Sequence, residues 1–358
     1  MSLSKLQQEI LDNDDPVIFV DSSAAAGKTR MIVAKIQKEL DANKGKVVAF
    51  TFTNAAAEEI RERIKVVDKD NLFIGTIHSY CVYLLLRAGY DEVKTLCDKE
   101  DFDGFFELIQ KYPNAAEPVY CTLCDEMQDC DEDQFNFIFN IIKSKKYFCC
   151  YDKKQSIFRW RGARPELLRK YIEEKNATVL SLNENYRNCA EILEYAKNII
   201  RLAGRDYIDN SIAMRKDKGK VYTNRQYNLD AIVNTIRKMT QENKNYCDWF
   251  ILARTNDQLQ EVARVLKRYN LPYATFKKSE FDNKELAAKM KENTIKLLTI
   301  HTAKGLEAKN VIVIGARFYN LEEKCISYVA ATRAKEMLVW VDYSTKPMRD
   351  KIVSNWED

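Results

Sequence analysis

The segment SSAAAGKTR, residues 22–30, carries the residue types that bind a phosphate group. It follows the apolar run VIFVD and precedes a stretch with helical periodicity, which is the context of a phosphate-binding loop. Gly27 lets the backbone approach a phosphate, and the amides at the helix start carry partial positive charge. Lys28 adds a full charge, and the Thr29 hydroxyl can ligate Mg²⁺. Ser22 replaces the first Gly of the GxxxxGK[ST] pattern, so an ordinary strand-to-helix turn is the alternative.

A triphosphate site that hydrolyses its ligand also needs a carboxylate for the metal and a group that orients water. Asp125 and Glu126 directly follow the apolar run VYCTLC, so both would lie at the end of a strand. Asp125 could hold Mg²⁺ through water, and Glu126 could accept a proton from the attacking water. A solvated acidic turn at a helix start is the alternative. The presence of Lys28 in the same chain favours the catalytic interpretation.

The elements that must position these residues form two series of alternating strands and helices. The first contains PVIFVD, a helix from Lys28 to Asp41, KVVAFTF, AAAEEIRERI, NLFIG, VYCTLCDE and KYFCCYD. The second begins at TVLSLNENY and continues through KVYTNRQY, DWFILAR, LQEVARVLKRY, TIKLLTIHT, NVIVIGA and MLVWVDY. This alternation predicts an α/β fold with two domains, each a mainly parallel sheet flanked by helices. We place the domains at residues 1–176 and 177–358.

Composition narrows the class of protein only a little. A net charge of +4 allows nucleic-acid binding but does not indicate it. No apolar run is long enough to span a membrane, and the start lacks the apolar stretch of a secretory signal, so we expect a cytoplasmic protein. Cys121 and Cys124 form a CxxC, which raises the possibility of zinc. Because they lie in a strand-like run and no second CxxC follows, we interpret them, like Cys149 and Cys150, as reduced core residues.

Ten segments together resemble superfamily 1 helicases of the UvrD/Rep type. They occur in the family's order, as LxxQQEI, AAAGKTR, AFTFTNAAAEEIRERI, GTIHSYC, CDEMQD, DKKQSIFRWRGA, LNENYRN, LARTNDQLQEVARVLKRYNLPY, LLTIHTAKGLEAKNVIVIGA and YVAATRAKEMLVW. The resemblance covers nearly the whole chain. It implies two RecA-like domains that share one ATP with Mg²⁺ at their interface and move on single-stranded DNA, 3′ to 5′. RNA is not excluded as the strand.

The resemblance also implies roles at the nucleotide. Gln7 would read the adenine edge, Arg30 and Tyr186 would sandwich its ring, and Glu307 would bind the ribose. Gln155 would sense the γ-phosphate, while Arg187 and Arg333 would reach it from the second domain as arginine fingers. For either arginine alone, a surface salt bridge is the alternative. Backbone contacts to the nucleotide are implied at Ala24, Ala25, Ala26, Gly27 and Gly305.

The strand would lie against aromatic and polar residues from several of these segments. The implied contacts are Phe52, Thr53, Asn54, His78, Phe158, Trp160, Arg161, His301 and Thr302. Aromatic faces stack on bases regardless of base identity, and Trp160 lies between two arginines, which disfavours its burial. Core packing is the alternative for each aromatic residue. Metal binding is the alternative for the two histidines, although neither has a partner at ligand spacing.

The chain departs from the family at several positions. The stretches that hold the large 1B and 2B inserts of the family are short, so we expect these subdomains to be absent or vestigial and unaided unwinding to be impaired. A partner protein could supply the missing function. Ser23 and Ala25 replace loop glycines, Ala55 replaces a Lys, and Tyr151 replaces a Gly. The predicted function is an ATP-dependent translocase or helicase. The alternatives are an ATP-driven regulatory switch and a nucleic-acid-binding module without turnover.

Overall fold

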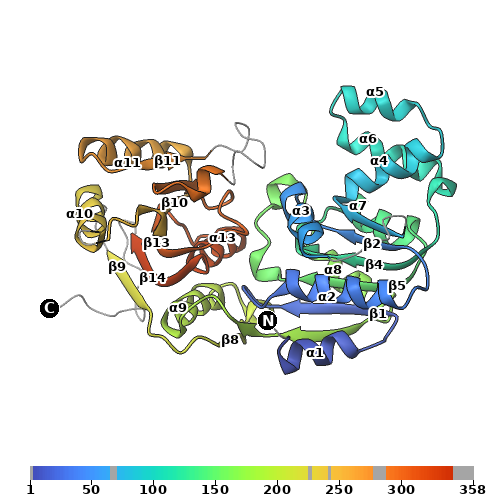
Figure 1. The fold of residues 1–358 in the computed structure, drawn as a ribbon, viewed down its shortest axis with the longest axis horizontal. Coiled ribbons are helices and arrows are strands. Elements are labelled where there is room, and N and C mark those ends of the chain that lie inside the picture. The colour runs from blue at the N-terminus through green and yellow to red at the C-terminus, as the bar shows by residue number, and fades with distance from the viewer. Residues whose placement is uncertain (1–2, 65–70, 225–227, 241–242, 277–287, 342–358) are drawn as a thin grey trace. The chain divides into compact units, whose positions relative to one another are not determined.

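The computed structural model describes residues 3–64, 71–224, 228–240, 243–276 and 288–341, with the exception of the side chain of Asn224. The chain divides into two compact units, Met1–Asn183 and Glu184–Asp358. Each unit contains a six-stranded sheet, and every recorded pairing in both sheets is parallel (Figure 1). The α/β fold class expected from the alternating pattern is therefore confirmed.

The N-terminal sheet has the strand order β3-β2-β4-β5-β1-β6. In this order the strands are β3 (Leu72–Gly75), β2 (Val47–Phe50), β4 (Val119–Cys124), β5 (Ser144–Tyr151), β1 (Val17–Ser22) and β6 (Thr178–Leu182). Because β4, β5 and β1 are consecutive and parallel, their carboxyl ends meet at one edge of the sheet. Loops that follow these three strands are the loops in which ligands bind in open α/β sheets.

Two hydrophobic cores cover the two faces of this sheet. Helices α1 (Lys5–Asp12), α2 (Lys28–Asp41) and α3 (Asn54–Arg63) pack on one face. Helices α4 (Ile77–Arg87), α6 (Phe102–Lys111) and α8 (Leu167–Glu174) pack on the other. Side chains of β1 alternate between the cores, since Ile18 and Val20 belong to the first and Phe19 to the second.

The cysteines of the CxxC follow the same alternation. Cys121 is buried in the core under α1–α3, and Cys124 is buried in the opposite core. Cys149 and Cys150 are also buried. The core interpretation of these four cysteines is confirmed.

The boundary between the units differs from the expected division at residue 176. Strand β6 pairs with β1, with Ile18 opposite Thr178 and Ser22 opposite Leu182. The TVLSL segment therefore completes the first sheet and does not begin the second. The sequence could not reveal this, because a strand-like run does not specify its pairing partner.

The C-terminal sheet has the order β11-β12-β10-β13-β14-β9. These strands are β11 (Tyr273–Thr275), β12 (Ile295–Thr299), β10 (Trp249–Ala253), β13 (Ala308–Ile314), β14 (Ala334–Val341) and β9 (Lys220–Asn224). Helices α10 (Leu229–Thr240) and α11 (Asn256–Arg268) share a core with the sheet, while α9 (Ala190–Arg201) and α13 (Leu321–Ala331) pack together beside β14. A separate pair, β7 (Glu184–Asn185) and β8 (Ile212–Ala213), begins the unit.

The connection between β3 and β4 contains α4, α5 (Glu92–Asp98) and α6, followed by a single 3₁₀ turn at Pro113–Ala115. This connection is a short helical insertion. Most of the connection between β11 and β12 lies outside the described residues. Among the helices of the described ranges, none combines the length and the apolar character needed to cross a bilayer.

Candidate nucleotide and strand sites

The loop after β1 has the backbone geometry of a phosphate-binding loop. Gly27 is the N-cap of α2, lies in the left-handed region with φ +84°, and provides no side-chain cap for the helix. The start of this helix is therefore not capped by the side chain of its N-cap residue. The positive φ at residue 27 favours glycine, and a Cβ at this position would lie 2.8 Å from Gln7 Nε2, so that the Gln7 side chain would have to shift. Helix α2 spans Lys28–Asp41, as the sequence predicted.

Lys28 points toward the acidic residues at the same edge of the sheet. Its Nζ lies 3.7 Å from Glu126 Oε1, and its side chain is only 9% exposed. Burial alone would lower the pKa of Lys28, but the charges of Glu126, Asp152 and Asp125 outweigh burial and raise it. The ammonium group is therefore held in its charged form, which is the form that binds phosphate.

Asp125 and Glu126 lie where β4 ends. The amide of Asp125 donates to Phe50 O on the neighbouring strand β2 at 2.9 Å, and Asp125 Oδ1 accepts from the amide of Glu126 at 2.9 Å. Glu126 has φ +56°, a conformation that costs free energy in a residue with a side chain. One carboxylate and the Thr29 hydroxyl fit a Mg²⁺ ion that takes its other ligands from phosphate and water. Among the described residues, no larger cluster of metal-binding side chains is present.

A buried hydrogen-bond network connects this edge to the segment that follows β5. Gln155 Nε2 donates to Asp152 Oδ2 at 2.7 Å, and Lys154 Nζ lies 3.0 Å from Asp152 Oδ1. The amide of Asp152 donates to Gln128 Oε1 at 2.8 Å, and Gln128 Nε2 donates to Glu126 Oε2. Gln155 was expected at the γ-phosphate, whereas Gln128 was not among the expected site residues. The signal available for Gln128 was its place two residues after Glu126 in CDEMQD.

Gln7 contacts the loop itself. Its Nε2 donates to Ala26 O at 3.0 Å, and its Oε1 accepts from the amide of Ser4 at 3.1 Å in a capping box of α1. The side chain is buried. In this arrangement both ends of the carboxamide are already bonded, so adenine recognition by Gln7 stays a prediction that requires the side chain to exchange partners.

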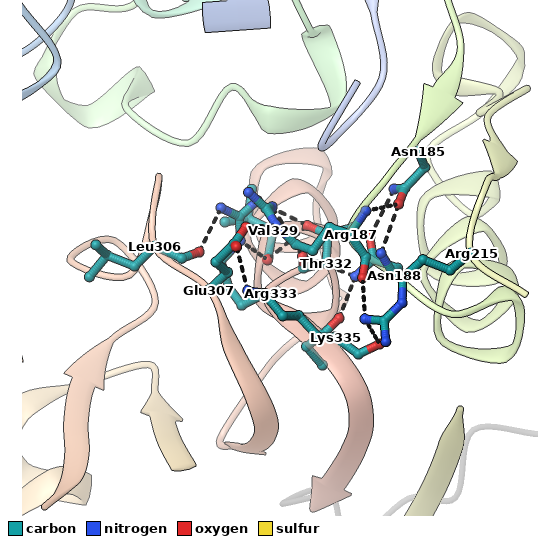
Figure 2. A network of polar contacts seen from close by, with 11 residues as sticks. Asn185, Arg187, Asn188, Arg215, Leu306, Glu307, Val329, Thr332, Arg333 and Lys335 are labelled. Atoms are coloured by element: carbon teal, nitrogen blue, oxygen red, sulfur yellow. Dashed lines mark hydrogen bonds and ion pairs between the residues drawn. The ribbon is translucent and has the colours of Figure 1, made fainter. Parts of the chain in front are cut away.

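In the C-terminal unit, Arg187 and Glu307 form the centre of a polar network, which Figure 2 shows from close by. Arg187 Nε donates to Glu307 Oε2 at 2.5 Å, and Lys335 Nζ lies 2.6 Å from Glu307 Oε1. Burial alone would raise the pKa of Glu307, but Arg187 and Lys335 together lower it to about 2. Ribose binding by Glu307 stays a prediction. The carboxylate already serves two cations, although it has further lone pairs.

Arg333 lies inside its own unit. Its side chain donates to Val329 O at 3.0 Å, to Leu306 O at 3.3 Å and to Thr332 Oγ1 at 3.1 Å, and the residue is 1% exposed (Figure 2). The sequence led us to expect a guanidinium presented to a phosphate. A role as an arginine finger therefore stays a prediction and requires Arg333 to leave some of these partners.

Hydrogen bonds join the segment that contains Arg187 to the segment that contains Arg333. Asn188 Nδ2 donates to Thr332 O at 3.2 Å and to Ala334 O. Arg215 Nη1 donates to Arg187 O at 3.0 Å and to Lys335 O at 3.3 Å (Figure 2). Asn188 and Arg215 were not among the residues expected from the sequence, because the backbone carbonyls that they bind lie far away along the chain.

The expected strand contacts divide into exposed and buried residues. Trp160 is 66% exposed, and the guanidinium carbon of Arg161 lies 5.7 Å from its ring centroid, so this pair is accessible to a base. Phe158 is 6% exposed, and its ring stacks on Phe52 at a centroid separation of 5.0 Å. In this arrangement the ring packs on Phe52 inside the unit, so a direct strand contact from Phe158 stays a prediction that requires the ring to become accessible.

The other expected residues lie in loops or at helix starts. His78 is half-buried in α4, with Phe102 and Phe106 beside its ring, and burial lowers its pKa. Thr53 caps α3 by accepting from the amide of Ala56, and Asn54 is exposed at the first position of that helix. Thr302 Oγ1 lies 2.8 Å from Thr299 Oγ1, and His301 is half-buried next to it. Their strand contacts stay predictions.

Among the remaining residues expected to contact the nucleotide, some side chains are exposed and others are buried. Tyr186 is exposed and donates to Glu184 Oε2 at 2.9 Å, and Arg30 is half-buried in α2. Gly305 is exposed with φ +87°. Of the loop alanines, Ala24 and Ala26 are buried, and Ala25 is half-buried with φ +57°.

Comparison with known families identifies the class of protein that this fold and these loops define. The UvrD/REP helicase N-terminal domain matches residues 3–117 and 106–176. The UvrD-like helicase C-terminal domain matches residues 180–287 and 277–345. The chain therefore belongs to the UvrD/Rep family of helicases, as the ten sequence segments indicated.

Individual relatives share less than a quarter of their residues with this chain. A probable DNA helicase II homolog of Mycoplasma capricolum is 23% identical over 74% of the chain and 50% of the relative. ATP-dependent DNA helicase PcrA of Staphylococcus aureus is 23% identical over 78% of the chain and 52% of the relative. The chain thus spans about half the length of these two proteins. Gabija protein GajB of Bacillus cereus is 23% identical over 98% of the chain and 99% of the relative.

Proposed function

We propose that this protein hydrolyses ATP with Mg²⁺ and uses the energy to move along single-stranded DNA. The observation that supports this most is the 3.7 Å approach of Lys28 Nζ to Glu126 Oε1 at the end of β4. At this distance a phosphate-binding cation and a candidate general base could both contact one bound triphosphate and its attacking water. Family membership and the relatives named as DNA helicases favour DNA over RNA as the strand.

The residues of the N-terminal unit would supply the metal ligands, the general base and one phosphate-binding cation for the hydrolytic step. Mg²⁺ on Thr29 and Asp125 would neutralise phosphate charge. Glu126 accepts a proton from water as the water oxygen bonds to the γ-phosphorus and the bond from that phosphorus to the bridging oxygen of ADP breaks. Lys28 stabilises the negative charge on the phosphate oxygens throughout. Gln155 reports the presence of the γ-phosphate to the segment that carries Trp160.

Movement requires that hydrolysis change how the two units engage the nucleotide. We propose that Arg187 and Arg333 reach the γ-phosphate and draw the units together, and that loss of the γ-phosphate releases them. The hydrogen bonds that join residues 187–188 to 332–335 support this idea, because they make both arginines part of one assembly. The direction, 3′ to 5′, is proposed from the family alone.

The short insertion between β3 and β4 bears on what the motor can do without help. Three short helices occupy the place of the family's 1B subdomain. We therefore propose that translocation is intrinsic and that duplex separation depends on a partner protein.

An ATPase assay with single-stranded DNA, single-stranded RNA and a forked duplex side by side tests the proposal. We expect hydrolysis to rise many-fold with single-stranded DNA and little strand displacement on the fork. Lys28→Ala should abolish hydrolysis, whereas Lys38→Ala, on the same helix and one-third exposed, should not. A rate that ignores nucleic acid would favour a regulatory switch. Strand binding without any hydrolysis would favour a binding module.

A further inference from the structure

Gln128 lies between the candidate base and the segment after β5, and none of the roles above uses it. Its Nε2 donates to Glu126 Oε2 and to Asp129 Oδ2, the latter at 3.4 Å. Its Oε1 accepts from the amide of Asp152 at 2.8 Å. The side chain is fully buried. We propose that Gln128 is a positioning residue that orients the Glu126 carboxylate and couples it to strand binding.

The orientation follows from how the two oxygens of Glu126 are held. Oε1 lies 3.7 Å from Lys28 Nζ, and Oε2 accepts from the Gln128 amide. One oxygen therefore has a cationic neighbour and the other a neutral donor, so the carboxylate plane is fixed from two sides. Catalysis is sensitive to such placement, since an error of about 1 Å can cost roughly 100-fold in rate.

The proposed coupling between strand binding and Glu126 depends on the hydrogen bonds that Gln128 accepts from the segment after β5. Its backbone carbonyl accepts from Ser156 Oγ at 3.0 Å, and its side chain accepts from the Asp152 amide. Asp152 and Ser156 belong to the same segment as Trp160, which is 66% exposed. A base that stacks on Trp160 can thus shift the segment that grips Gln128, and Gln128 shifts Glu126. Stimulated hydrolysis should depend on Gln128 more than basal hydrolysis does.

The test is Gln128→Glu, and it rests on the proposed function. The new side chain has nearly the same shape and can still accept from Asp152, but it cannot donate to Glu126. We expect kcat with single-stranded DNA to fall roughly 10- to 100-fold, as for a misplaced general base. The KM for ATP and the affinity for a fluorescent oligonucleotide should stay close to wild type. Gln128→Met keeps the length without adding charge and should reproduce the loss.

Gln134→Glu is the matched control. Gln134 is also buried and lies nearby in sequence, in α7 (Glu132–Asn136), but its Oε1 accepts from the amide of Asp131 in a capping box. Glutamate preserves that bond, so DNA-stimulated turnover should remain at the wild-type level.

The outcomes separate this inference from the proposed function. A wild-type protein without DNA-stimulated hydrolysis would refute the proposed function itself. Wild-type stimulation that persists in both Gln128 variants would overturn the positioning role. A loss of kcat accompanied by equal losses in ATP affinity, oligonucleotide affinity and thermal stability in both variants would assign Gln128 to the core alone, which also overturns it.

Discussion

Glu307 and Arg187 are joined by a hydrogen bond of 2.5 Å from the guanidinium Nε to the carboxylate Oε2, although 120 positions separate them in the chain. Lys335 contacts the other oxygen of the same carboxylate. A residue expected at the ribose thus neutralises a residue expected at the γ-phosphate. If Arg187 acts as proposed, an incoming phosphate has to compete with Glu307 for its guanidinium.

This pairing predicts a specific pH dependence of stability. The pKa of Glu307 is lowered to about 2 from an ordinary value of 4.5, so its ionisation stabilises the fold above about pH 4.5. That contribution is lost as pH falls toward 2. The difference in urea-unfolding free energy between wild type and Glu307→Gln should be largest above pH 5 and should shrink by pH 3.

Glu194→Gln is the control for this experiment, because Glu194 is exposed on α9 of the same unit. It should change stability little at any of these pH values. The wild-type protein could instead exceed Glu307→Gln in unfolding free energy by the same amount from pH 7 to pH 3. That result would mean that ionisation of the carboxylate contributes nothing to stability.

Gln7→Ala tests whether this residue acts on the base or on the loop. Because Gln7 Nε2 donates to Ala26 O, its loss should loosen the phosphate-binding loop. We expect KM to rise for ATP and GTP in the same proportion. Gln8→Ala on the same helix should leave both unchanged, since the Gln8 side chain is exposed and bonded to Asp12. A KM that rises for ATP alone would instead establish adenine recognition.

Ala25→Gly should stabilise the N-terminal unit. Ala25 has φ +57°, which costs a residue with a Cβ roughly 1 kcal/mol, and glycine removes that cost at the expense of a more flexible unfolded chain. We expect an unfolding free energy that is unchanged or up to about 1 kcal/mol higher. Ala42→Gly, at the C-cap of α2 with φ −66°, should only destabilise. Equal destabilisation by both changes would mean that Ala25 is not strained.

Local motifs were predictable because their chemistry and their backbone geometry are encoded in adjacent residues. The strand, glycine and lysine of residues 17–28 specify a loop and the start of α2, and the structure has both. The parallel sheets followed from the alternation of apolar runs with amphipathic stretches. Asp125 and Glu126 were found because a strand-like run ends directly before them.

What the sequence concealed depends on packing between distant residues. An apolar run such as Thr178–Leu182 is compatible with either sheet, and only its pairing with β1 shows that it belongs to the N-terminal sheet. An arginine is usually exposed, so nothing local indicated that Arg333 would be buried on the carbonyls of Val329 and Leu306. Phe158 lies directly before a short 3₁₀ turn, and such a turn has no periodicity that would show which side chains are buried.

Trp160→Ala should weaken binding of single-stranded DNA. The ring is exposed and adjoined by Arg161, so its removal eliminates a stacking surface worth roughly 1 to 3 kcal/mol. Fluorescence anisotropy with a labelled oligonucleotide would measure the change. Leu202→Ala, which removes an exposed apolar side chain at the end of α9, should have no effect. Unchanged affinity of the Trp160 variant would exclude this residue from the strand path.

Glu126→Gln should separate nucleotide binding from turnover. The amide cannot accept the proton of the attacking water, so kcat should fall by roughly 100- to 10,000-fold. ATP affinity should be equal or tighter, because the change removes a negative charge beside Lys28, where the triphosphate would lie. Glu132→Gln, at the exposed start of α7, controls for the loss of a nearby carboxylate. Single-turnover hydrolysis and binding of a non-hydrolysable ATP analogue measure the two effects independently. Near-normal turnover in Glu126→Gln would move the role of general base to another residue and would remove the basis of the mechanism proposed for this unit.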